Sequence, residues 1–177
     1  TAPQRWYLGS AWPCGQLIEL QPVHVGCGEL SIIWPMVACQ TQQSQPVLLI
    51  SPPLIPCPQA WKQAGVDLSH LWIVRSQDHS LWAAEHALKS GLCGAVVAWP
   101  HPKQLTTTRL RRLQLACEHG RAPCFLIDSD LTRPLTSSSA LRLKIAPGPT
   151  ITLMHTRHAQ ASKPRTLDLG LNTLAAQ

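Results

Sequence analysis

The sequence has 177 residues, of which 45% are hydrophobic and 14% are charged. This length most simply corresponds to one domain with a substantial core, and the composition excludes intrinsic disorder. The net charge of +6 suits a nucleic-acid or acidic-protein partner as well as ordinary solubility. No apolar run reaches the ~18–20 residues that a membrane-spanning helix needs.

The seven cysteines do not form a pattern typical of a zinc module or a disulfide framework. Their number is odd, and no pair has CxxC spacing. Several lie inside apolar runs, where cysteine behaves as a small buried hydrophobe. We therefore expect a reducing, cytoplasmic compartment. The first residues have no signal-peptide pattern, and we expect further chain ahead of them.

The amino-terminal part of the chain alternates short apolar runs with helical segments. The predicted strands are residues 15–20 and 46–50, and the predicted helices run from Glu29 onward and over residues 58–65. Pro35 is expected in the first turns of the earlier helix or at a kink in it. Pro58 favours the start of the later helix, because proline is tolerated at the first helical position.

Residues 65–100 predict a strand–helix–strand unit. Residues 71–74 and 95–98 are apolar at every position, which is typical of strands covered on both faces. Between them the helical period extends over residues 78–90, with Asp78 as the expected N-cap and Gly91 just beyond the helix. Two such runs joined by one helix indicate a parallel sheet.

The carboxyl-terminal part begins with a helix and ends with an alternating pattern. In chain order we expect a helix from residue 102 or 103 to 119 followed by Gly120, a buried strand at 122–127, a polar loop at 128–139, antiparallel strands at 141–145 and 151–153, and an edge strand at 165–169. The predicted fold is therefore α/β, with a mostly parallel sheet and an antiparallel extension. The expected organisation is an irregular segment at 1–15, one domain at 16–155 and a polar tail at 156–177.

The loop after the first strand occupies the position of a P-loop but lacks its chemistry. A working P-loop needs a lysine for the phosphates and a Ser or Thr for Mg²⁺. In Gly26-Cys27-Gly28-Glu29-Leu30, Glu29 stands in place of the lysine and Leu30 in place of the Mg²⁺ ligand. The strands at 46–50 and 95–98 end in Ser51 and Trp99, without the carboxylate that an NTPase uses. We therefore expect that the protein does not hydrolyse nucleotides, has no cofactor and is not an enzyme.

The order of elements is similar to the RecA ATPase core, and the chain resembles the ImuA/SulA group, the non-ATPase branch of that superfamily, more closely. The resemblance covers roughly residues 13–155. Its segments are 17–20 followed by 26–30, 50–53 followed by 64–68, 81–85, 93–100, 110–116 and 140–143. The most specific parts are Ala98-Trp99-Pro100 and residues 110–116.

The resemblance implies a three-layer RecA-like fold and a role in SOS-induced mutagenesis. ImuA-like proteins act with ImuB, a catalytically inactive Y-family polymerase homologue, with a DnaE-type polymerase and with RecA. SulA, the smaller relative, instead inhibits cell division by binding FtsZ. This chain carries more than a minimal SulA core at both ends, which favours ImuA. Oligomers through RecA-like surfaces and weak DNA contact are further expectations.

Five residues are candidates for partner binding: Trp61, Trp99, Arg109, Arg111 and Arg112. The three arginines make one side of the predicted long helix basic, as either a solvated face or a patch for DNA or an acidic partner. Trp99 is either a core residue at the rim or an interface anchor in the vacated nucleotide site, and Trp61 suits core and interface equally. The eight histidines show no ligand spacing, so no metal site is expected.

Overall fold

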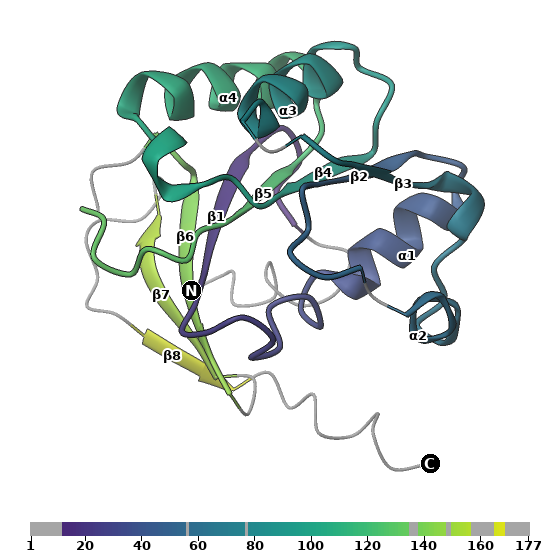
Figure 1. Cartoon of the computed structure of the whole chain (residues 1–177), viewed down its shortest axis with the longest axis horizontal. Helices are drawn as coiled ribbons and strands as arrows, with labels where there is room; N and C mark the ends of the chain where they lie inside the picture. The colour runs from purple at the N-terminus through teal and green to yellow at the C-terminus, as the bar shows by residue number, and fades with distance from the viewer. Residues whose placement is uncertain are drawn as a thin grey trace, which may run out of the picture.

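One sheet of eight strands runs through the protein (Figure 1). The computed structural model describes residues 12–55, 57–76, 78–134, 138–147, 150–156 and 165–168, with the backbone alone for 155–156 and 165–168. The strands are β1 (Leu17–Pro22), β2 (Val47–Ile50), β3 (Leu71–Val74), β4 (Ala95–Ala98), β5 (Cys124–Ile127), β6 (Leu141–Ala146), β7 (Thr150–Thr156) and β8 (Arg165–Asp168). Their order across the sheet is β3-β2-β4-β5-β1-β6-β7-β8.

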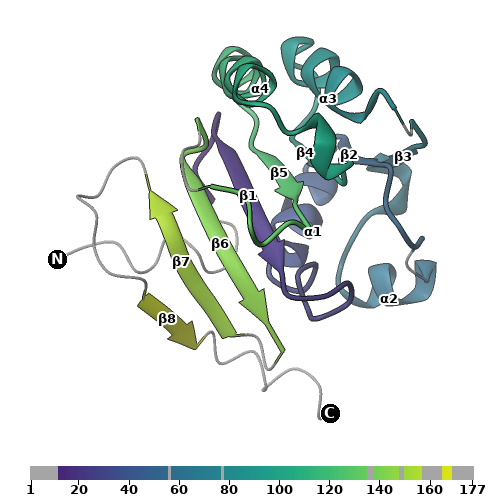
Figure 2. The ribbon, with the colours of Figure 1, turned by 60° about the vertical axis from the view of Figure 1, so that its left-hand side comes forward.

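The strands from β3 to β6 pair in parallel, and β7 is antiparallel to both of its neighbours. Figure 2 shows β6, β7 and β8 extending the sheet away from the helices. This arrangement confirms the predicted α/β class with its antiparallel extension. The edge strand expected at 165–169 is present as β8, which pairs with β7.

Helices cover both faces of the parallel part of the sheet (Figure 1). They are α1 (Trp34–Gln42), α2 (Pro58–Gln63), α3 (Ser80–Lys89) and α4 (Thr107–Gly120), with short 3-10 turns η2 (Leu68–His70) and η3 (Pro102–Gln104). The helices α1 and α2 lie on one face, and α3 and α4 lie on the other. The protein therefore has three layers.

Alternate residues of the central strands supply two separate cores. In β4, Val96 and Ala98 pack under α3 and α4, whereas Ala95 and Val97 pack on the opposite side. All four are fully buried. A strand with helices on both faces has no side that can carry polar residues, which is why β4 is apolar throughout.

The prediction that β3 is buried was wrong. Trp72 and Ile73 are 59% and 40% exposed, because β3 is the edge strand and pairs only with β2. The sequence pattern is the same as in β4, but helices cover β4 and leave these β3 side chains open to solvent.

Several helix boundaries also differ from the sequence prediction. The helix expected from Glu29 begins at Trp34, with Pro35 in its first turn. The helix α3 begins at Ser80 with His79 as its N-cap, so Asp78 does not cap it. The predicted helix at 102–119 is divided into η3 and α4. The Thr106 side chain accepts a hydrogen bond from the N–H of Arg109 and so caps α4.

The carboxyl-terminal end of α4 approaches α3 very closely. Gly120 is the last residue of the helix, and Arg121, rather than Gly120, takes the left-handed conformation after it, with φ of 56°. A Cβ atom at Gly120 would lie 1.9 Å from the carbonyl oxygen of Leu88. Glycine is therefore required here for close packing of the two helices. Within the described residues, no helix is both long and apolar enough to cross a bilayer.

Candidate functional site

The loop after β1 folds onto itself at the carboxyl ends of the parallel strands, where a P-loop ATPase would bind its nucleotide. The Glu29 carboxylate accepts a hydrogen bond from the N–H of Gly26 at 3.1 Å, and its side chain is buried. Gly26 and Gly28 adopt positive φ angles of 82° and 106° that favour glycine. A phosphate-binding loop needs such N–H groups free to meet an anion. Here one of them is occupied by a carboxylate from the same loop.

The ends of β2 and β4 lie at the same edge and carry no acidic side chain. The Ser51 hydroxyl donates to the carbonyl oxygen of Ser76 at 2.8 Å and lies 3.0 Å from the hydroxyl of Ser80. The Trp99 side chain is half-buried against the α1 side of the core, and the backbone N–H of Trp99 donates to the carbonyl oxygen of Ile50. These side chains close the strand ends and do not present a metal ligand.

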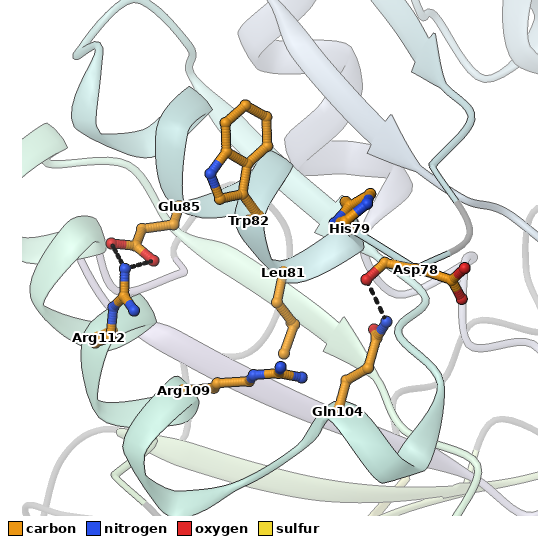
Figure 3. A pocket seen from close by; sticks show the side chains of 8 residues that line it. All are labelled: Asp78, His79, Leu81, Trp82, Glu85, Gln104, Arg109 and Arg112. Atoms are coloured by element: carbon orange, nitrogen blue, oxygen red, sulfur yellow. Dashed lines mark hydrogen bonds and ion pairs between the residues drawn. The ribbon is translucent and has the colours of Figure 1, made fainter.

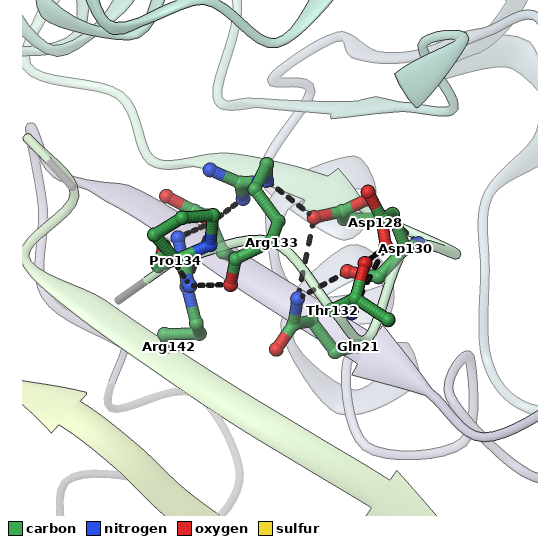
Figure 4. A network of polar contacts seen from close by, with 8 residues as sticks. Gln21, Asp128, Asp130, Thr132, Arg133, Pro134 and Arg142 are labelled. Carbon is green, nitrogen blue, oxygen red and sulfur yellow. Dashed lines mark hydrogen bonds and ion pairs between the residues drawn. The ribbon is translucent and has the colours of Figure 1, made fainter. Parts of the chain in front are cut away.

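A buried network of charges lies on β1 and β6 beneath the 128–134 loop (Figure 4). Glu19 of β1 and Arg142 of β6 are both fully buried, with Arg142 Nε 3.0 Å from Glu19 Oε2. Arg133 forms ion pairs with both Glu19 and Asp128, the latter at 2.8 Å. Gln21 Nε2 donates to Asp128 at 3.3 Å. The network fixes the 128–134 loop onto the sheet.

The charges of this network largely balance. Burial lowers the pKa of Arg142, and the nearby Glu19 only partly offsets that effect. Burial also opposes the charge of Arg133, but Glu19 and Asp128 outweigh it and raise its pKa. Both carboxylates are therefore engaged by guanidinium groups within the protein, and the arrangement is structural.

Sequence reasoning missed this network, although it left a signal. Glu19 interrupts the apolar run of β1, and Arg142 lies between two leucines that face the opposite core. The alternation in β6 indicated a solvent-facing side for Arg142. The 128–134 loop covers that side instead, and a loop over a sheet face is not visible in a periodicity.

A cavity of about 230 Å³ lies between α3 and the start of α4 (Figure 3). Trp82 and Glu85 of α3 line it together with Gln104, Arg109 and Arg112. Glu85 is bound by Lys89 at 2.6 Å and by Arg112 at 3.1 Å. Burial opposes ionisation of Glu85, but hydrogen bonds from Lys89 and Arg112 outweigh it and lower the pKa of the carboxyl.

The five candidate residues from the sequence do not form one surface. Trp61 is only 2% exposed and packs edge-on against Trp34, with ring centroids 3.8 Å apart, so its indole belongs to the core. Trp99 is half-buried at the strand ends. Arg109 and Arg112 line the α3–α4 cavity, whereas Arg111 is exposed and does not line it. The three arginines of α4 therefore do not share one side of the helix: Arg109 and Arg112 face the cavity, and Arg111 faces solvent.

The largest exposed apolar side chains on the β2–α2 connection are Leu54 and Ile55, which are 72% and 51% exposed. Large apolar side chains at a surface are typical of contact sites when they occur together. Among the described residues, no group of three or more His, Cys, Asp or Glu side chains could hold a metal ion.

Comparison with known proteins identifies a fold relative. No protein-family model matches the sequence, and no curated protein matches it significantly. The crystal structure of SulA from Pseudomonas aeruginosa is similar to this chain, with a TM-score of 0.51 and 21% identity. The match covers 64% of this chain and 98% of that chain. The protein is thus an α/β protein of SulA-like fold, and at this identity the likeness concerns the fold alone.

Proposed function

We propose that the protein is a non-catalytic member of the DNA-damage (SOS) response that acts by binding another protein. The observation that carries this proposal is the contact between Glu29 and the N–H of Gly26. It places a buried carboxylate inside the loop that would have to receive a polyphosphate. A negative charge in that position opposes phosphate binding.

The strand ends support the same conclusion. A RecA-type ATPase needs a carboxylate to hold Mg²⁺ and a group that orients the attacking water. Trp99 and the Ser51–Ser80 pair occupy the corresponding strand ends. The frame is retained, but the groups that perform the chemistry are replaced by packing and hydrogen-bonding residues.

Isothermal titration calorimetry with Mg·ATP tests the absence of nucleotide binding. We expect no heat of binding at protein concentrations that detect micromolar affinity. An active RecA-type ATPase run under the same conditions serves as the positive control. Saturable binding of Mg·ATP at micromolar affinity would overturn the proposal.

The first candidate activity is SulA-like inhibition of FtsZ polymerisation. It is favoured by the fold match, which extends over nearly all of SulA. Sedimentation of FtsZ polymers tests it, and we expect stoichiometric protein to leave FtsZ in the supernatant. The variant to compare is Leu54→Ser with Ile55→Ser, and the matched control is Leu92→Ser, an exposed leucine in the α3–β4 connection. Inhibition that depends on the first pair and not on Leu92 supports this candidate.

The second candidate is an ImuA-like adaptor that binds an ImuB-like polymerase homologue or RecA. Two observations favour it. The match to SulA covers 64% of this chain and so leaves 36% outside it. The sheet extends through β7 and β8. The sequence segments given above resemble those of ImuA-like proteins. Co-purification with the ImuB homologue and with RecA tests it, with FtsZ in the same experiment as the competitor. Binding to ImuB or RecA, with FtsZ polymerisation unaffected, selects the adaptor.

A further inference from the structure

The outer face of α3 and α4 presents an aromatic side chain that is ordered but not buried. Trp82 is 59% exposed, although it lies in the first turn of a well-packed helix. Its ring contacts the His86 ring one turn along in a tilted arrangement, with centroids 4.1 Å apart. This contact restrains the indole and leaves most of it open to solvent. A restrained, exposed tryptophan loses little conformational entropy on binding and is typical of an interface anchor.

The charges beside Trp82 leave an excess of positive charge on this face. Lys89 and Arg112 share the single carboxylate of Glu85. Arg109, at the mouth of the same cavity, forms no ion pair with any described residue. Figure 3 shows the Arg109 guanidinium below Leu81 and Trp82, while the Asp78 carboxylate points away from it. A carboxylate from another molecule could therefore pair with Arg109 without displacing an existing partner.

From these two features we propose that the α3–α4 face docks an acidic segment of a partner protein. A carboxylate of the segment pairs with Arg109, and an apolar side chain packs on Trp82. The cavity volume of about 230 Å³ is below the range of about 300–1,000 Å³ for small-molecule sites, so it suits a side chain rather than a cofactor. The proposal rests on the proposed function only in that the protein acts by binding.

A nucleic-acid backbone fits this face less well. Nucleic-acid binding depends on several cations that contact successive phosphates. Arg111, which would extend a basic stripe, does not line the cavity. Nucleic-acid binding is therefore an outcome of the test that would contradict the proposal.

The test uses fluorescence anisotropy of a labelled peptide in which one phenylalanine is flanked by Asp and Glu residues. Three further probes are the same peptide with alanine in place of phenylalanine, the same peptide with lysines in place of the acidic residues, and single-stranded oligo(dT). We expect saturable binding of the first peptide alone. The change Arg109→Glu should weaken it about tenfold or more, and Trp82→Ala by a similar factor.

Matched controls separate this face from general charge and general tryptophan effects. Arg111→Glu makes the same charge change two residues along α4, and Trp72→Ala removes a tryptophan with the same 59% exposure on β3. Both should change the affinity by less than about twofold, as expected for residues outside a contact. Urea unfolding of each variant checks that the fold is intact.

The proposal fails if no probe binds at millimolar protein, if Arg109→Glu and Arg111→Glu weaken binding equally, or if oligo(dT) binds in place of the peptide. These outcomes are distinct from failure of the proposed function. Peptide binding that depends on Arg109 together with micromolar ATP binding would retain the docking face and remove the non-catalytic assignment. If the peptide does not bind but the protein still inhibits FtsZ polymerisation, the docking face is rejected and the proposed function is retained.

Discussion

The carboxylate of Glu29 accepts a hydrogen bond from the backbone N–H of Gly26, 3.1 Å away, within the loop that follows β1. In the sequence, Glu29 indicated only that the lysine of a P-loop is absent. In the structure it is a buried side chain that closes the loop from inside. The contact therefore holds the loop in a closed form, with the carboxylate in the position of the P-loop lysine.

Placing a lysine at position 29 should not create a nucleotide site. Glu29→Lys buries an ammonium group and leaves the Gly26 N–H without its acceptor, which should lower the free energy of unfolding by roughly 2–4 kcal/mol. Urea denaturation measures this loss. Ser31→Lys, at an exposed position of the same loop, should cost about 1 kcal/mol or less. If Glu29→Lys gained ATP affinity by calorimetry, our account of the loop would be wrong.

The buried pair of Glu19 and Arg142 should show strong coupling. Glu19→Leu leaves the Arg142 guanidinium buried without a carboxylate in contact, and we expect a loss of about 3–5 kcal/mol. Arg142→Leu should cost less, because Glu19 keeps its ion pair with Arg133. The double variant should cost clearly less than the two single changes together. Additive effects in urea unfolding would show that the pair is not coupled.

The contact between Gly120 and Leu88 should make position 120 intolerant of alanine. The added Cβ would overlap the Leu88 carbonyl oxygen at 1.9 Å and push α4 from α3, at a cost of about 3 kcal/mol or more. Gly91→Ala is the comparison, because its φ of 68° is strained for alanine but nothing lies within 4 Å of its Cβ position. Its cost should be about 1 kcal/mol. Equal losses in thermal or urea unfolding would contradict the close packing.

The ion pairs of Glu85 should make part of the stability depend on pH. The folded-state pKa of Glu85 lies below its ordinary value of 4.5. The stability that ionised Glu85 contributes is therefore fully present above pH 4.5 and is lost as the pH falls through the folded-state pKa. Glu85→Gln should therefore be less stable than the natural chain by about 1 kcal/mol at neutral pH, because the cations are partly exposed and screened. The difference should shrink as the pH is lowered below 4.5. A constant difference from neutral to acid pH would exclude an electrostatic origin.

The thiols should divide into two classes by reactivity. Cys14 and Cys57 are exposed, whereas Cys93, Cys117 and Cys124 are buried. Burial raises the pKa of Cys93 to about 11, so little thiolate is present at neutral pH. Mass spectrometry after brief iodoacetamide treatment of the native protein should find the exposed pair modified first. Labelling in urea provides the control, because all thiols are then accessible. Early modification of Cys93 in native protein would contradict its placement.

Much of the fold followed from local patterns. Continuous apolar runs and period-3.6 repeats predicted the strands and helices of the parallel sheet in their correct order, and the alternation in β6 and β7 predicted the antiparallel extension. The boundaries were less accurate, since caps depend on single hydrogen bonds such as that of Thr106 with Arg109. The burial predicted for Trp72 was wrong, and the sequence left core and interface open for Trp61, because an apolar residue type does not reveal which neighbours cover it.

The sequence by itself determined the class of fold and the absence of a P-loop lysine, because both depend on residue type and spacing along the chain. Only the tertiary structure decided which charged residues are buried and which surfaces are exposed. Glu19 and Arg142 are 123 residues apart in the chain and meet only because β1 and β6 pair. Trp82 and Arg109 line one cavity only because α3 and α4 pack together. Contacts of this kind arise from packing between distant elements, which no local pattern records.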